Sequence, residues 1–366
     1  KSSWLSPTQV QGLTTSQLSS FTSQHLGFFD PKDMASLSSV QLNSFQTNVI
    51  ANLNSQQVQA LTTDQLVGLN TQQFSSLSTA SIKALTTLQI RVLTSAQLNS
   101  LGSAHIAAIE TTDIAALTTT QVSTLSTTQI AGLSTAPVAA LSTGQVAALT
   151  SVQLNAMASD DLKALTTTQV RALTSDQLSK LSSDQVALMA TDDIAAISSA
   201  QISHLSTGAI GALTTAQAKA LTTAAINALT SAQIAAIETA DLAAMSSTQL
   251  SNMGNTQVAQ LTSLQVAALT TGQLKSLSSG QVAALTSEQL NALTSAQLSS
   301  LSSSQVRALT TDQLSKLTTT QVAGLSTAQV AALSTGQVAA LTSVQLNAMA
   351  SDDLKALTTT QVRALT

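Results

Sequence analysis

Cysteine is absent from the 366 residues, which excludes a disulfide framework, a thiolate metal site and c-type haem attachment. Charged residues make up only 8% of the chain, whereas globular proteins use about 25%. Thirteen basic residues against 17 acidic ones leave a net charge of -4, so no basic stripe is available for the phosphates of DNA or RNA. No apolar run approaches the length of a membrane span, and the opening KSSWLSPTQV lacks the pattern of a signal peptide. We therefore expect no nucleic-acid partner and no membrane span, with any export signal outside this chain.

What the chain has instead is one eight-residue word, [S/T]-[S/T]-x-Q-[V/L/I]-x-A-L, repeated without insertion or deletion. We call each copy an octad and the glutamine its register position. Register glutamines recur from Gln9 to Gln361, and a large apolar residue follows four places later, from Leu13 to Leu365. About 45 copies identify a repeat protein. Disorder is the alternative, but an aliphatic pair in every octad argues against it.

The capping chemistry predicts a helix in each octad. In residues 166–173, Thr166 precedes Gln169 by three places, which is the capping box at a helix start. Val170 and Leu173 then share one face of a helix, whereas a strand would place them on opposite faces. One continuous helix is excluded, because its apolar face would rotate by about 80° per octad. The helix must break at the Ser/Thr pair, so we predict an all-α solenoid of very short capped helices.

The number of helices in each turn of the solenoid is less directly encoded. Aspartate replaces glutamine at six register positions whose separations are all multiples of sixteen: Asp33, Asp113, Asp161, Asp193, Asp241 and Asp353. This spacing favours pairs of helices in 16-residue hairpins, with three or four helices per turn as the alternative. Either arrangement would give a thin rod on the order of 150–200 Å long.

Two regions are distinguished by composition. Residues 1–58 hold divergent octads and most of the aromatic side chains, and we interpret them as a terminal cap or a contact surface. Residues 59–366 form the regular array, in which 133–174 recur at 325–366 with Gln329 in place of Pro137. The aromatic residues are Trp4, Phe21, Phe28, Phe29, Phe45 and Phe74.

Nothing in the sequence predicts catalysis, so we expect a protein that is not an enzyme, with no catalytic, cofactor-binding or metal-binding residues. The histidines are dispersed, and two of them replace a register glutamine: His25, His105 and His204. Adjacent acids are expected in the first turns of helices, where they complement the dipole: Asp160-Asp161, Asp192-Asp193 and Asp352-Asp353. Basic residues that follow the register aliphatic residue are expected to be solvated: Lys83, Arg91, Lys163, Arg171, Lys275 and Arg307. Because Gln169 is expected to serve only its own cap, Gln169→Ala should cost little more than a cap, whereas replacing Leu173, Leu181 and Leu205 with Ser should melt the local array.

Words such as LTTTQVRALTSDQL, ALSTGQVAALTSVQL and LTSEQLNALTSAQL resemble tandem tracts in giant surface or secreted proteins of proteobacteria. Those proteins are grouped with adhesins or loosely labelled as haem-utilisation proteins. The resemblance implies an extracellular or cell-surface location, and it carries over no binding residue. The motif LT-x-x-Q-V is also similar to the first helix of DNA-reading effector repeats, but those repeats are much longer and the basic charge is missing here.

The sequence therefore predicts an extracellular structural protein, acting as a stalk, spacer or filament subunit of a bacterial surface or adhesin system. Its expected partners are further copies of itself, through end-to-end or lateral contacts, or adjoining domains of a longer chain. The alternative is a solenoid that binds peptide or glycan ligands through its variable positions.

Overall fold

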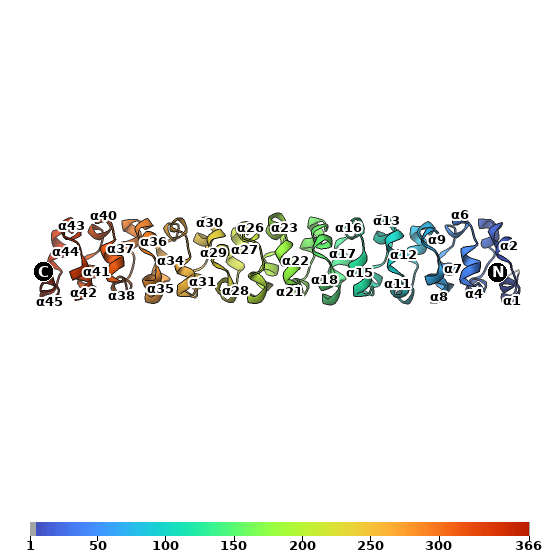
Figure 1. Ribbon diagram of the computed structural model, residues 1–366, viewed down its shortest axis with the longest axis horizontal. Coiled ribbons are helices and arrows are strands. Elements are labelled where there is room, and N and C mark those ends of the chain that lie inside the picture. The colour runs from blue at the N-terminus through green and yellow to red at the C-terminus, as the bar shows by residue number, and fades with distance from the viewer. Residues whose placement is uncertain (1–4, 366) are drawn as a thin grey trace. The chain divides into compact units, whose positions relative to one another are not determined.

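The computed structural model describes residues 5–365 and is all-α, with 45 short helices and no strand among these residues. Helix αn begins at residue 8n − 1 for every n from 1 to 45, and each helix has four to six residues. The first is α1 (Pro7–Gln11), a full-length example is α7 (Ser55–Ala60), and the last is α45 (Thr359–Val362). The predicted solenoid of one short helix per octad is confirmed (Figure 1).

Each helix begins where the Ser/Thr pair predicts it. At α21 (Thr167–Arg171), the Thr166 backbone N–H donates to Gln169 Oε1 at 2.8 Å, and the Gln169 N–H donates to Thr166 Oγ1 at 3.3 Å. Two extended residues join successive helices: after α7 they are Leu61 (φ −61°, ψ 129°) and Thr62 (φ −68°, ψ 160°). No described residue has a positive φ, so the corners need no glycine.

The structure forms two compact units, residues 1–181 and 182–366. Within each unit a helix packs on the third helix along the chain, as α4 (Pro31–Ser36) does on α7. Three helices, or 24 residues, therefore make one coil, and the predicted 16-residue hairpin is wrong. Two extended residues turn the chain by only a third of a circle, so three corners are needed before a helix meets a neighbour. The duplicated segments are 192 residues apart, which is eight whole coils.

Each coil buries the two aliphatic residues of its octads. In α21 and the corner after it, Val170 is 0% and Leu173 4% exposed. The residue before the corner is most often small, as Ala172 is, although Lys180, Leu188 and Lys316 also occupy this position. At Gly132 the preceding coil comes close, since an added Cβ would lie 3.0 Å from Ser103 Cβ, so a larger side chain there would require Ser103 to move.

The N-terminal octads also bury their large apolar residues, and several of these residues are aromatic and form a cluster on the first coils. The Phe21 ring lies 6.0 Å from both Phe29 and Phe45, and Phe74 is fully buried further along. Phe28 is 45% exposed, and Trp4 lies outside the described residues. The role of residues 1–58 as a cap or contact surface stays a prediction. Among the described residues, no helix has the length and hydrophobicity needed to cross a bilayer.

Candidate functional site: the glutamine ladder and its gap

The register glutamine links two coils. Gln169 is 2% exposed, and its Oε1 accepts the capping bond of its own helix. Its Nε2 donates to backbone carbonyls of the preceding coil, those of Val138 at 2.9 Å, Ala139 at 3.3 Å and Leu141 at 2.7 Å. These carbonyls end helix α17 (Thr135–Ala140), where an isolated helix leaves its acceptors unpaired. One side chain therefore satisfies the start of one helix and the end of another.

We call the register glutamines that make this bond the glutamine ladder. The acceptors lie 28 and 31 residues earlier in both units, as for Gln97 with Leu69 and Leu66, and for Gln281 with Met253 and Leu250. The expectation that Gln169 serves only its own cap is therefore wrong, because the amide nitrogen is also used. The sequence held a signal for this, since glutamate never occupies the register position although it suits a capping box equally well. The glutamine amide both accepts and donates, whereas a glutamate carboxylate only accepts.

The three histidines differ in their surroundings. His25 Nδ1 accepts from the Thr22 N–H at 3.1 Å and so takes the capping role. His105 takes the other role, with Nε2 3.0 Å from the Leu77 carbonyl oxygen, while His204 is exposed. In residues 5–365 no three His, Asp or Glu side chains gather in a way that could hold a metal ion.

The register aspartates are buried at the third position of their helices. In the predicted acid pair of α20 (Ser159–Lys163), Asp160 is exposed and Asp161 is 4% exposed. Burial raises the pKa of Asp161 above its usual 3.8, and repulsion from Asp160 adds to the shift. Burial also raises the pKa of Asp33 and of Asp193. Asp113 accepts a hydrogen bond from the preceding coil, since Thr87 Oγ1 donates to its Oδ1 at 2.7 Å.

Three successive interruptions of the ladder fall on one edge of the first unit. Asp113, Pro137 and Asp161 are 24 residues apart, so they occupy the same place in consecutive coils. A proline cannot supply either half of the glutamine bond. Sequence reasoning singled out Pro137 only as the difference between the duplicated segments, because the 24-residue period was not recognised.

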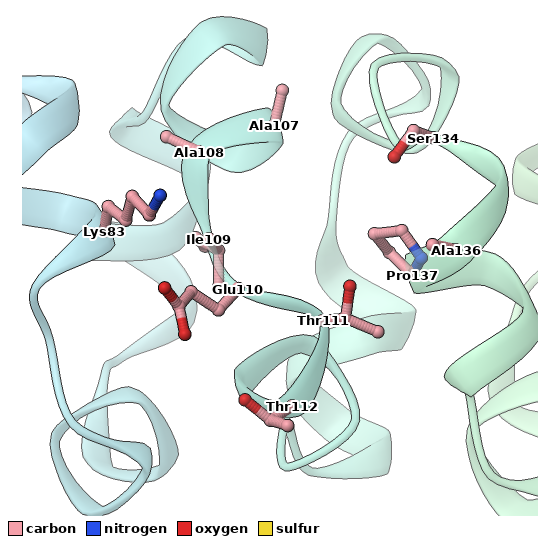
Figure 2. A pocket seen from close by; sticks show the side chains of 10 residues that line it. All are labelled: Lys83, Ala107, Ala108, Ile109, Glu110, Thr111, Thr112, Ser134, Ala136 and Pro137. Carbon is pink, nitrogen blue, oxygen red and sulfur yellow. The ribbon is translucent and has the colours of Figure 1, made fainter.

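An open pocket of about 440 Å³ lies beside the middle interruption. We call it the Pro137 pocket. In Figure 2, Ser134, Ala136 and Pro137 lie across the pocket from the segment that joins α13 (Ser103–Ala108) to α14 (Thr111–Ile114). Glu110 belongs to that joining segment, and Lys83, at the end of α10 (Thr79–Lys83), lies on the same side of the pocket (Figure 2). Lys83, expected to be a solvated side chain, is exposed and lines this pocket.

A second pocket, of about 250 Å³, lies at the aromatic cluster and is lined by Phe21, His25, Phe28, Phe29, Asp33 and Leu5. It is mainly apolar. Buried Asp33 Oδ1 has no hydrogen-bond partner among the described residues. Leu5 adjoins residues 1–4, which are not described.

The similarity of this chain to known proteins lies in its repeat. No curated protein matches the chain significantly. The model of the ALTTAQ repeat matches nine segments that cover well over half of the sequence: 34–71, 66–103, 106–143, 154–191, 186–223, 234–271, 267–295, 288–319 and 314–343. The chain therefore belongs to the ALTTAQ repeat family.

Proposed function

We propose that this chain is an extracellular structural repeat protein, a stalk, spacer or filament subunit of a bacterial surface or adhesin system. The observation that carries the proposal is the glutamine ladder, which fastens coil after coil by the same bonds. Each added coil brings its own buried aliphatic residues and its own links to the previous coil. Such an array can be lengthened without redesign.

Composition and duplication support the proposal. The surface consists largely of Ser, Thr, Ala and Asn with few charges, as expected of an exposed polymer. The copies at 133–174 and 325–366 are separated by a whole number of coils, so equivalent residues occupy the same place in the coil in both copies. The partners we propose are further copies, through end-to-end or lateral contacts, or adjoining domains of a longer chain.

A shortened chain tests the spacer role. Deletion of residues 133–324 removes eight coils and joins 132 to the duplicated segment in register. Small-angle scattering should show a maximum dimension that falls in proportion to the coils removed, as expected for a one-dimensional array. An unchanged maximum dimension would show that the coils do not set a length.

Location needs a separate test. Antibodies raised against the full chain should stain intact cells of the source organism. Staining that requires permeabilised cells would contradict the extracellular role.

A second candidate function is a solenoid binding module for peptide or glycan ligands. The Pro137 pocket favours it, because it is an open site at a place where the repeat is otherwise filled by its own glutamine. The two functions are compatible, since a spacer can carry a ligand site at one interruption.

A further inference from the structure

The two duplicated segments provide an internal comparison of the same site with and without its glutamine. Gln329 replaces Pro137 in the second copy. There, Ser326 N–H donates to Gln329 Oε1 at 2.9 Å, and Gln329 Nε2 donates to the carbonyls of Ser299 at 3.2 Å and Leu301 at 2.7 Å. Gln329 is 2% exposed, so this place normally holds one buried carboxamide.

At Pro137 these groups are present without the carboxamide. The carbonyls of Ala107 and Ile109 correspond to those of Ser299 and Leu301, and no donor among the described residues reaches either of them. Ser134 corresponds to Ser326, and its backbone N–H has no acceptor among the described residues. Residues 107, 109 and 134 all line the Pro137 pocket. Acceptors on one side and a serine with a free N–H on the other therefore border an accessible space.

We propose that the Pro137 pocket binds a primary carboxamide, carried by a glutamine side chain of a peptide. Its NH₂ group would donate to the carbonyls of Ala107 and Ile109, and its oxygen would accept from the Ser134 N–H, which reproduces the bonds of Gln329. The pocket is open and larger than one amide, which leaves room for the peptide backbone beside it.

The backbone groups of the pocket favour a group that both donates and accepts. A carboxylate could accept from the Ser134 N–H and would be attracted by Lys83 on the pocket wall, but the two carbonyl oxygens and Glu110 would repel it and both carbonyls would stay without a donor. An ammonium group would satisfy the carbonyls and Glu110 but leave the Ser134 N–H without an acceptor. Of these three groups, only the carboxamide pairs with both sides. The inference is independent of the spacer role, because a length test does not involve this pocket.

The test uses the full chain with ¹³C-labelled isoleucine methyl groups, because Ile109 lines the pocket. The probes are the peptide acetyl-Ala-Gln-Ala-N-methylamide, whose only primary carboxamide is the glutamine side chain, and its glutamate counterpart. The glutamine peptide should shift the Ile109 methyl resonance saturably, and the glutamate peptide should bind at least roughly tenfold more weakly. No shift, or equal shifts by the two peptides, would overturn the proposal.

Two substitutions at one position separate the pocket from a general disturbance. Pro137→Gln fills the pocket with the protein's own amide and should abolish the peptide-dependent shift. Pro137→Ala leaves the space open and should keep it. Binding that survives Pro137→Gln, or that is lost equally in both variants, would contradict the assignment.

The second copy offers the reciprocal change. Gln329→Pro opens the equivalent site, and in leucine-labelled protein the glutamine peptide should then shift the Leu301 methyl resonances. A folded variant without this shift would contradict the proposal.

Discussion

At the scale of single residues, the register glutamine joins local and long-range structure. Its oxygen holds the start of its own helix and its nitrogen holds the end of a helix in the preceding coil. Glutamate could keep the first bond but not the second, and a hydrophobic residue could keep neither. Buried acceptors left without a donor are more costly than an exposed cap, because they have also lost water.

Gln169→Ala should therefore destabilise its coil more than Thr166→Ala does. We expect a loss of about 2–4 kcal/mol for the glutamine against about 1 kcal/mol for the threonine cap. Native-state hydrogen exchange of the Val170 amide, which donates to Thr166 O at 2.9 Å, measures the free energy of local opening. Gln169→Glu is the matched control, since it keeps the capping acceptor only. Equal effects of Thr166→Ala and Gln169→Ala would contradict the two-coil role.

Asp161, which occupies the same place in its coil as Pro137 does, should make the stability of the chain depend on pH. The pKa of Asp161 is raised in the folded state, so the folded chain holds this proton more tightly than the unfolded chain. Stability from this group is present below pH 3.8, the usual value, and is lost as pH rises from there through the raised pKa. Asp161→Gln should remove this loss and add about 1 kcal/mol at neutral pH.

Thermal unfolding between pH 3 and pH 7 (a range of roughly 4 pH units about the ordinary carboxyl value) measures this effect. Asp176→Asn is the matched control, because it removes an exposed carboxylate from the first turn of α22 (Ser175–Lys180). An unaltered profile in Asp161→Gln would show that Asp161 is not the group responsible.

Sequence reasoning at this scale predicted the capping box at Thr166 and Gln169 and the burial of Val170 and Leu173. It missed the second bond of Gln169, because its acceptors lie 28 and 31 residues away and belong to a helix that is not a neighbour in sequence. It identified Pro137 as a difference between the duplicated segments but drew no structural conclusion from it. The octad pattern predicts bonds within one helix, whereas the pocket depends on which residues the 24-residue coil brings together.

At the scale of the helix, four to six residues are too few for independent stability. Most helices persist because both of their ends are bonded, the first by its cap and the last by a ladder glutamine, and because the aliphatic pair is covered by the third helix along. The octad was enough to predict the helices but not the coil. How far two extended residues turn the chain depends on backbone angles, which the residue types constrain only loosely.

The effect of a deletion on stability should depend on whether it removes a whole number of octads. Removal of residues 279–286, one octad, brings equivalent residues into every vacated place, so the thermal midpoint should fall by only a few degrees. Removal of 283–286, half an octad, places small residues where aliphatic ones are buried and should unfold the coils around it. Hydrogen exchange by mass spectrometry distinguishes the two. Equal protection in both deletions would show that the eight-residue register is not essential.

At the scale of each compact unit, coils interact with their immediate neighbours only. Stability should then be a sum of coil and interface terms, and unfolding need not be all-or-none. We expect calorimetry of the full chain to give a calorimetric enthalpy larger than the van't Hoff enthalpy. A ratio of one would mean that the 366 residues unfold as a single cooperative body.

The ladder also has a direction. Every ladder glutamine donates to carbonyls that precede it in the chain, as Gln97 does to Leu66 and Leu69. During synthesis the acceptors therefore leave the ribosome before the amide that needs them, and each new coil can fold against one that is already complete. A chain with the opposite polarity would have to hold its amides open until later residues arrived. The orientation of one side-chain amide thus suits this array to be built in the order in which it is translated.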